Sequence, residues 1–236
     1  MEVVLGTSVQ DRPITAHRFG LGTQKVVLIG DIHGGTEANT YRLMVGVLAH
    51  FRLHPDAVPD DAALWIVPTA NPDGLVSGTR LNSRGVDLNR NADTRNDPCP
   101  ESRWQPDTHT SEGIIPGGGG SEPWSEPETQ ALRDFLADAQ VVISYHSQWG
   151  AVLAGGCEKS ASTLRLVETL RSATGYPVPE TGFVAYPVTG DLTDYLALRG
   201  VAVATIELTD KVDPELERNL EGILAVLDGL DTILVD

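Results

Sequence analysis

The chain has 236 residues, 41% of them hydrophobic and 21% charged, and a formal net charge of −16 at pH 7. This composition and length suit one large domain spanning residues 1–236. The acidic balance disfavours nucleic acid and anionic membrane surfaces as partners. The sequence contains no run of 18 apolar residues that could cross a membrane, and we expect the chain to act as a monomer.

The first residues and the cysteines bear on the compartment. The N-terminal segment lacks the basic region and the apolar core of a signal peptide, which predicts a cytoplasmic protein, or a secreted one if the chain has been trimmed. Two cysteines, Cys99 and Cys157, are too few for a disulfide framework or a Cys-rich zinc site. They form either one bridge between loops or two free thiols.

The first third of the chain is predicted to contain three strands and one helix. Apolar patterning favours strands over residues 13–19 and 25–32, a helix over residues 37–51 and a third strand over residues 62–67. The second of these strands is almost entirely apolar, as expected of a central, parallel strand with both faces buried.

The remaining elements continue this alternation after a long loop at residues 91–125. Ser125 is predicted to be the N-cap of a helix that has Pro127 in its first turn and ends near residue 137. Further strands are expected at residues 140–145, 151–154 and 201–208, and further helices at residues 161–173, 191–198 and 214–230. The alternation predicts an α/β fold, a three-layer α/β/α sandwich with a mixed, mostly parallel central sheet.

A polar stretch at residues 71–91 follows the third strand. It opens with Asn71, Pro72, Asp73 and Gly74, a combination typical of a turn in which Gly74 takes a positive φ. Its other notable side chains are Arg80, Asn89 and Arg90. Guanidinium and amide donors match a carboxylate or an oxyanion. The alternative is a solvated loop whose polar groups make structural hydrogen bonds.

Two histidines and a glutamate lie at the carboxyl ends of predicted strands. These residues are His33, His146 and Glu207, and Glu37 follows in the turn after His33. Since the carboxyl ends of parallel strands share one edge of a sheet, the four side chains can meet there. Two histidines and a carboxylate are the ligands of many catalytic zinc sites. A single histidine in such a place is more often structural, and His17, His50, His54 and His109 are interpreted as surface or packing residues.

These residues belong to a longer series of matching segments, and the sequence resembles the funnelin-type zinc metallocarboxypeptidases, in particular the compact bacterial members. The series follows the order of that family and spans nearly the whole chain. The matching segments are His33 with Glu37, residues 71–74, residues 80–82, residues 85–90, residues 145–147, Tyr186 with Gly190 and Asp194, and residues 206–208.

The resemblance implies a catalytic site with one Zn²⁺ per chain. It implies that His33, Glu37 and His146 are the metal ligands and that a zinc-bound water attacks the scissile carbonyl. Glu207 would be the general base, and Arg80 would stabilise the oxyanion.

The resemblance also implies how the substrate is held. Asn89 and Arg90 would bind the terminal carboxylate of a peptide, or of a peptide derived from peptidoglycan, and Tyr186 would close over it. The implied reaction is hydrolysis of the C-terminal amide bond.

The sequence departs from the family pattern at two places. Three residues separate His33 from Glu37 where the family usually has two, so Asp31 is kept as the alternative carboxylate ligand. The position at the floor of the specificity pocket is Thr193, which is neither the acid nor the aliphatic residue of the better-known members.

Asp191 is open to two interpretations. As the residue that begins a short helix, it can be an N-cap satisfied by backbone N–H groups. Alternatively, an unpaired Asp191 carboxylate beside Thr193 would bind the amino group of a terminal residue such as diaminopimelate.

Two other functions are compatible with much of the pattern. One is a zinc-dependent deacylase of N-acyl amino acids, and the other is a non-catalytic domain that binds peptides. Residues 71–74 and the Tyr186 segment favour the peptidase over the deacylase. The chain keeps all the ligands and the base implied by the resemblance, which argues against a non-catalytic domain.

Overall fold

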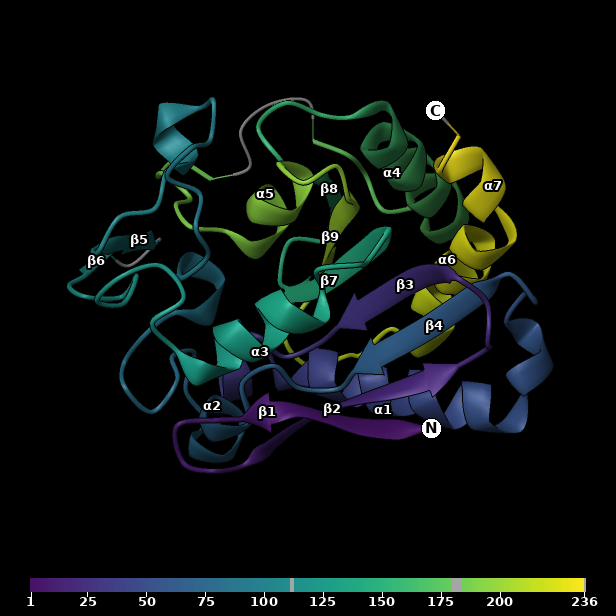
Figure 1. Ribbon diagram of the computed structural model, residues 1–236, viewed down its shortest axis with the longest axis horizontal. Helices are drawn as coiled ribbons and strands as arrows, with labels where there is room; N and C mark the ends of the chain where they lie inside the picture. Colours follow the sequence, from purple (N-terminus) through teal and green to yellow (C-terminus); the bar gives the residue numbers. More distant parts are fainter. Residues whose placement is uncertain (111–112, 180–183, 236) are drawn as a thin grey trace.

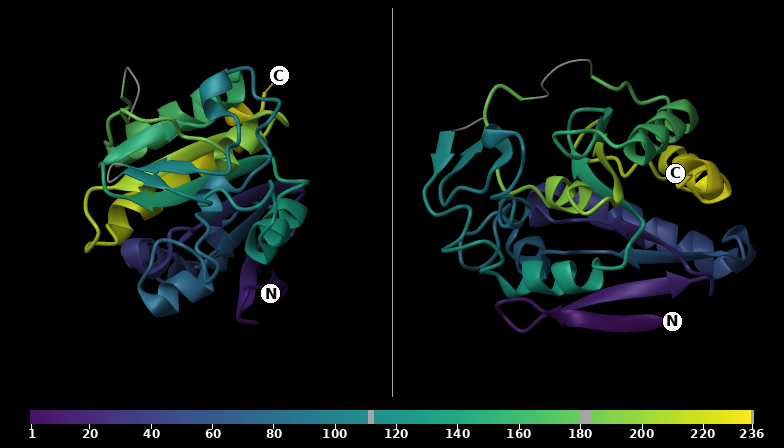
Figure 2. Two further views of the ribbon diagram at one scale, coloured as in Figure 1. Left: turned by 90° about the vertical axis from the view of Figure 1, so that its left-hand side faces the viewer. Right: turned by 45° about the horizontal axis from the view of Figure 1, so that its top comes forward.

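The computed structural model describes residues 1–110, 113–179 and 184–235, and a seven-stranded sheet with helices on both faces dominates it (Figures 1 and 2). In spatial order the strands are β1 (Glu2–Thr7), β2 (Pro13–Phe19), β4 (Ala62–Val67), β3 (Gln24–Ile29), β7 (Val141–Ser147), β9 (Ala202–Leu208) and β8 (Ala151–Ala154).

The centre of the sheet is parallel and its margins are antiparallel. Strands β4, β3, β7 and β9 run in the same direction, whereas β1, β2 and β8 each pair in the opposite sense. The central position and parallel pairing predicted for β3 are confirmed, and so is the mixed sheet. Strand β1 was not predicted, because its residues are at most half-buried and carry only a weak apolar signal.

Alternate residues of the central strands face two separate cores. Val26 and Leu28 of β3 lie in the core covered by α1 (Ala38–Leu53), α4 (Ala161–Thr174), α6 (Leu216–Asp228) and α7 (Leu230–Ile233). Val27 and Ile29 lie in the opposite core, which is covered by α3 (Pro127–Phe135) and α5 (Leu192–Ala197). This period of two confirms the three layers. No helix in the described part of the chain has the length and apolarity needed to span a bilayer.

The prediction of a turn at residues 71–74 is wrong, because these residues begin a helix. Asn71 is the N-cap of α2 (Pro72–Ser77), and its Oδ1 accepts a hydrogen bond from the backbone N–H of Gly74. Proline fits the first helical position because its missing N–H would have no intrahelical partner there. The left-handed residue is Gly78, at the end of α2, with φ 72°.

The segment between α2 and α3 is mostly irregular, as predicted, but it contains short elements. These are the 3₁₀ turns η3 (Leu88–Arg90) and η4 (Pro100–Ser102) and the small strands β5 (Thr108–Thr110) and β6 (Gly113–Ile115). Helix α3 begins one residue later than predicted, with Glu126 as the N-cap and Pro127 at its first position. Ser125 instead donates a hydrogen bond to the Glu126 carboxylate.

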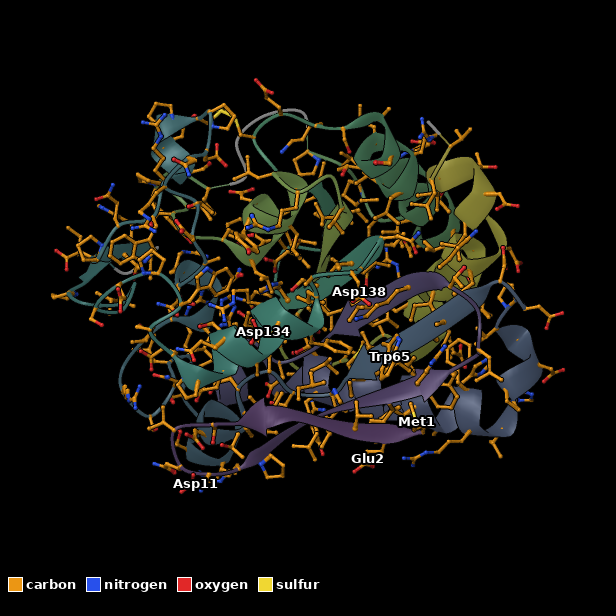
Figure 3. All side chains as sticks on the ribbon, in the orientation of Figure 1. Met1, Glu2, Asp11, Trp65, Asp134 and Asp138 are labelled. Carbon is orange, nitrogen blue, oxygen red and sulfur yellow. A yellow bond between two sulfur atoms is a disulfide. The ribbon has the colours of Figure 1, made fainter. Side chains whose placement is uncertain are left out.

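The two cysteines form a disulfide, so the first of the two alternatives for Cys99 and Cys157 is correct. The bond is seen at the upper left of Figure 3. It joins the segment that carries η4 to the loop after β8, across 58 residues of sequence. Two long connections at one end of the sheet are therefore covalently held together.

We predict that Gly34→Ala destabilises the protein more than Gly175→Ala does. Both glycines have positive φ, which costs a residue with a Cβ about 1–2 kcal/mol. At Gly34 the new Cβ would also lie 2.4 Å from the carbonyl oxygen of Thr79, whereas at Gly175 no atom lies within 4 Å. The crowding should therefore add about 1–3 kcal/mol at Gly34. Urea denaturation of both variants measures the difference, and equal losses would contradict the prediction.

Candidate active site

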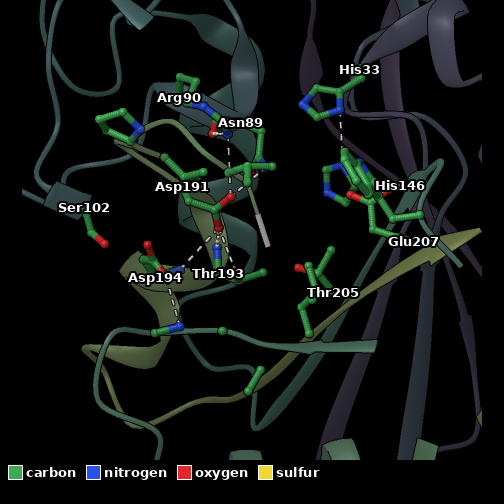
Figure 4. Close-up of a pocket in the computed structure, with 18 of the residues that line it drawn as sticks. His33, Asn89, Arg90, Ser102, His146, Asp191, Thr193, Asp194, Thr205 and Glu207 are labelled. Carbon is green, nitrogen blue, oxygen red and sulfur yellow. Dashed lines mark hydrogen bonds and ion pairs between the residues drawn. The ribbon is translucent and has the colours of Figure 1, made fainter. Parts of the chain in front are cut away.

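The carboxyl ends of β3, β7 and β9 border a cavity of about 420 Å³. His33, His146 and Glu207 lie on one side of this cavity, and Asp191, Thr193 and Asp194 lie on the other (Figure 4). The strand ends therefore converge as the parallel centre of the sheet requires.

Three predicted metal ligands meet at the strand ends. The Nδ1 atoms of His33 and His146 are 3.1 Å apart. One carboxylate oxygen of Glu37 lies 2.9 Å from Nδ1 of His33, and the other lies 3.5 Å from Nδ1 of His146. One donor atom from each residue falls within 4.8 Å of the others.

This donor set fits a zinc ion. The three side chains are almost completely buried. Burial alone would raise the pKa of Glu37, but the two histidine rings outweigh it and hold the pKa well below its usual range. An ionised carboxylate and two ring nitrogens are ligands that zinc prefers, and three protein ligands leave a fourth position open, as in catalytic sites.

Polar groups behind the ligands fix the histidine rings. Ser144 lies 2.9 Å from Nε2 of His146, and the carboxylate of Asp87 lies 3.4 Å from Nε2 of His33. Such partners orient a ring so that its other nitrogen faces the metal. Neither residue was singled out from the sequence. Asp87 lies within the matching segment 85–90, which could have pointed to it.

The structure favours Glu37 over Asp31 as the carboxylate ligand. The extra residue between His33 and Glu37 is accommodated in the 3₁₀ turn η1 (Gly34–Glu37), where Gly34 has φ 52°. Asp31 lies outside the ligand group, and one of its oxygens accepts a 2.6 Å hydrogen bond from Thr69. Burial raises the pKa of Asp31 to about 8.

Glu207 reaches the cavity beside the ligands. It is the register partner of His146 between β7 and β9, so the two side chains leave the sheet on the same face. Burial raises the pKa of Glu207 to about 7. Its Oε2 is buried and has no hydrogen-bond partner among the described residues. This position suits a group that exchanges a proton with a molecule in the cavity.

Arg80 lies between two carboxylates at the wall of the cavity. Its Nε donates to Asp87 at 2.8 Å, and its Nη1 lies 3.4 Å from Glu37. Burial would lower its pKa, but these two carboxylates raise it above the usual value. The guanidinium is therefore a fixed positive charge next to the ligand group.

Asn89 and Arg90 lie together in η3 and line the same cavity. Nη1 of Arg90 donates to the backbone oxygen of Asn89 at 2.7 Å, and the buried Nε of Arg90 has no hydrogen-bond partner in the described part of the chain. A buried guanidinium with an unused N–H donor can bind a carboxylate group of a ligand.

Asp191 is a helix cap and not an unpaired acid. Its Oδ1 accepts hydrogen bonds from the backbone N–H groups of Thr193 and Asp194 at the start of α5. Its Oδ2 accepts a 2.7 Å hydrogen bond from Asn89 and lies 3.8 Å from Arg90. Both oxygens are thus engaged, which removes the basis for amine recognition by Asp191. Tyr186 and Thr193 also line the cavity, as predicted.

Several further residues of the cavity wall were not assigned a role from the sequence. Among them are Glu101, Lys159, Asp194 and Thr205. Glu101 lies in the short 3₁₀ turn η4 and Lys159 in a loop, and neither segment has a periodicity that signals which way a side chain points. Asp194 belongs to the matching segments but carries no distinctive local pattern.

A family model described as zinc carboxypeptidase matches residues 1–216. The chain belongs to this family. This match confirms the predicted family and the predicted enzyme class. Zinc dependence is confirmed as a property of the family.

Two bacterial proteins are similar in sequence to parts of this chain. Bacteriocin BCN5 of Clostridium perfringens is 28% identical over 177 residues, which are 64% of this chain and 18% of that protein. Murein peptide amidase A of Escherichia coli K12 is 39% identical over 83 residues, which are 34% of each protein. The alignments thus span about a fifth and a third of the lengths of these relatives.

The family fold extends over the chain. The structure of bovine thrombin-activatable fibrinolysis inhibitor in complex with tick carboxypeptidase inhibitor superimposes with a TM-score of 0.78 at 18% identity. The superposition covers 98% of this chain and 90% of the bovine one. At this identity the similarity concerns the fold alone.

We predict that Glu37→Gln abolishes stoichiometric zinc binding in this zinc carboxypeptidase-family protein, whereas Asp31→Asn retains it. The amide cannot supply the anionic oxygen that faces the two histidines, and mutation of Asp31 leaves all three ligands in place. The check is metal content after dialysis against trace zinc, with circular dichroism to confirm folding. Zinc loss in Asp31→Asn alone would show that Asp31 is the ligand.

Proposed function

We propose that the protein is a zinc metallocarboxypeptidase that hydrolyses the C-terminal amide bond of a peptide or of a peptidoglycan-derived peptide. The observation that carries this proposal is the composition of one cavity. It combines a group of three possible metal ligands, a glutamate beside it whose pKa is raised by burial, and an asparagine–arginine pair suited to a carboxylate. The carboxylate anchor is what an exopeptidase requires. A deacylase of N-acyl amino acids would also bind a substrate carboxylate, so only a comparison of peptide and N-acyl amino acid substrates separates the two functions.

One zinc ion, held by His33, Glu37 and His146, would supply Lewis acidity that polarises a carbonyl group and acidifies a water molecule. The donor atoms and burial of the three side chains support this assignment.

Glu207 is the proposed general base and acid. Its unpartnered Oε2 can take a proton from water and then deliver it to the leaving amine. A pKa of about 7 suits both proton transfers, because a group with that pKa can take up or release a proton near neutral pH.

Arg80 and the η3 pair have separate proposed tasks. Arg80 borders the ligand group, where its fixed charge stabilises negative charge that develops on the carbonyl oxygen. Asn89 and Arg90 hold the substrate's terminal carboxylate, for which the unused Nε donor of Arg90 is available. Tyr186 closes over the bound terminal residue from its place on the cavity wall.

The peptidoglycan option rests on one relative and on the disulfide. Murein peptide amidase A is named for a murein peptide substrate, and its 83 aligned residues are 39% identical to this chain. The bond between Cys99 and Cys157 favours an oxidising compartment outside the cytosol. We infer that the protein works where cell-wall peptides and an oxidising environment occur together.

We predict that Glu207→Gln keeps its zinc but lowers kcat by about 10²- to 10⁴-fold, the range for loss of a general acid–base group. Glutamine has nearly the same shape but cannot take up the proton. The matched control is Glu168→Gln, which changes an exposed residue of α4 and should leave kcat intact. Near wild-type turnover in Glu207→Gln would place the base elsewhere.

We predict that amidation of the substrate's terminal carboxylate lowers kcat/KM at least tenfold. A charge-assisted contact contributes about 1.5–3 kcal/mol, and 1.36 kcal/mol corresponds to a factor of ten. A blocked dipeptide, its amide and an N-acetyl amino acid should be compared. Equal cleavage of acid and amide would exclude the anchor, and a preference for the N-acetyl amino acid would identify a deacylase.

A further inference from the structure

A buried carboxylate lies beside the disulfide of Cys99 and Cys157. Asp97 is completely buried, and its Oδ2 atom has no hydrogen-bond partner in the described part of the chain. A carboxylate oxygen of Asp97 and the sulfur atoms of Cys99 and Cys157 all lie within 4.8 Å of one another. A disulfide has no S–H group that could donate to the carboxylate. The oxidised cysteine pair therefore leaves a buried polar atom unsatisfied, which is rare and unfavourable in proteins.

The loop holds the Asp97 carboxylate in place without help from the sulfur atoms. Its Oδ1 accepts a 2.8 Å hydrogen bond from the backbone N–H of Cys99. The backbone N–H of Asp97 donates to the backbone oxygen of Thr94, and the backbone oxygen of Asp97 accepts from Nε of Arg103. The free carboxylate oxygen should thus stay beside the two sulfur atoms when the bond between them is broken.

Reduction of the disulfide converts these side chains into metal ligands. Two molecules of a thiol supply two electrons and two protons to the S–S bond and become one disulfide themselves, which leaves Cys99 and Cys157 as thiols. Thiolate sulfur and carboxylate oxygen are both ligands of Zn²⁺. The two thiol protons are released when the metal binds, because only the thiolates coordinate it.

The spacing of the two cysteines suits a shared metal ion. Their Cα atoms are 5.9 Å apart. Zinc–sulfur bonds of about 2.3 Å at a tetrahedral angle place two sulfur atoms about 3.8 Å apart, and rotation about the Cα–Cβ bonds can separate the sulfur atoms in this way. Both cysteines are only half-buried, so water can reach the fourth position of a tetrahedral site.

This group shares no residue with His33, Glu37 and His146. In the described ranges of the chain, these are the two places where three ligand atoms of His, Cys, Asp or Glu side chains come so close together. The first group consists of nitrogen and oxygen donors, whereas the second adds two sulfur atoms. Metal binding at the two places can therefore be told apart by the kind of donor.

We propose that Asp97, Cys99 and Cys157 bind one Zn²⁺ ion when the disulfide is reduced. The cysteines supply two thiolates, Asp97 supplies one carboxylate oxygen, and water takes the fourth position. The site exists in the chain before its disulfide has formed, or after a thiol has reduced it. Cys157 and the η4 residues Glu101 and Ser102 line the active-site cavity. The ion thus holds together the same two wall segments that the disulfide joins in the oxidised protein.

The hydrogen bond from Cys99 to Asp97 could also serve only to shape the loop. In that case reduction yields two free thiols, and the carboxylate has no effect on metal binding. Zinc binding that requires both sulfur atoms and the charge of Asp97 distinguishes the proposed site from this structural role.

The first experiment compares the metal content of the oxidised and the reduced protein. The reduced sample is prepared without oxygen by tris(2-carboxyethyl)phosphine, which becomes its phosphine oxide, and both samples are dialysed against trace zinc. We expect one more zinc ion per chain in the reduced protein. With Co²⁺ in place of zinc, only the reduced protein should show the intense near-ultraviolet absorption of thiolate-to-cobalt charge transfer. Equal zinc contents or the absence of this absorption would overturn the inference.

Two matched variants then test the carboxylate ligand. Asp97→Asn keeps both thiols, and the zinc affinity of its reduced form should fall at least about tenfold, since even the partners of metal ligands contribute this much. Competition with a chromophoric chelator measures the affinity. The control is Asp93→Asn, because Asp93 lies in the same segment but pairs with Arg95 outside the ligand group. Equal affinities in the two variants would overturn the role of Asp97, and with it the proposed site.

Two further variants locate the extra ion. Cys99→Ser should show neither the additional zinc nor the cobalt absorption, and this result does not depend on how well Asp97→Asn folds. Reduced Glu37→Gln should still gain one zinc ion relative to its oxidised form. Loss of that gain would assign the extra ion to the group of His33 and His146 and overturn the inference. None of these measurements requires turnover, so their failure would leave the peptidase proposal standing.

Discussion

The buried carboxylate of Glu37 is the charge that the surrounding structure most needs to compensate. An uncompensated charge in a protein interior costs several kcal/mol, and the fold surrounds this one with donors. The backbone N–H of Ser147 lies 3.1 Å from Oε2, and Nη1 of Arg80 lies 3.4 Å from Oε1. Because Ser147 ends β7 and Glu37 follows β3, the same contacts hold two strand ends together. The site and the edge of the sheet therefore stabilise each other.

The position of the proton on the His33 ring determines whether Nε2 can accept a hydrogen bond from Arg80. Nε2 of His33 lies 2.7 Å from Nη2 of Arg80 and 3.4 Å from the Asp87 carboxylate. It cannot accept from the guanidinium and donate to Asp87 at the same time. In the proposed function, a zinc ion on Nδ1 would leave the proton on Nε2 with Asp87 as its partner. Nη2 of Arg80 would then lose its acceptor on His33. The proposed roles of His33 and Arg80 would thus depend on each other through one ring.

Local patterns predicted the elements that depend on local physics. The apolar strands and the long helices were placed to within a few residues. The meeting of His33, His146 and Glu207 at the strand ends followed from the parallel sheet, whereas the choice of metal ligands came from the family resemblance. Local patterns failed where one sequence motif is compatible with two kinds of local structure. They also failed where a residue's role depends on contacts with distant segments. Proline after asparagine suits a turn and the first helical position equally well, which is why α2 was missed. The place of Asp87 behind His33 depends on tertiary contacts, and only the family segment around it could have suggested that role.

Asp191 and Asp194 show why pocket specificity is hard to derive from sequence. Both acids lie at the start of α5, three residues apart, and either could cap it. The extended backbone of Asp191, with φ −70° and ψ 139°, makes it the N-cap, so the helix uses its charge. Asp194 then faces Gly156, and Lys159 reaches the same glycine from the other side. In a chain of net charge −16, one more carboxylate would favour any cationic ligand. The Nζ of Lys159, bonded to the backbone around Gly156, places a positive charge at the same wall. The charge balance there therefore depends on contacts between α5 and the loop after β8, which no local pattern in either segment contains.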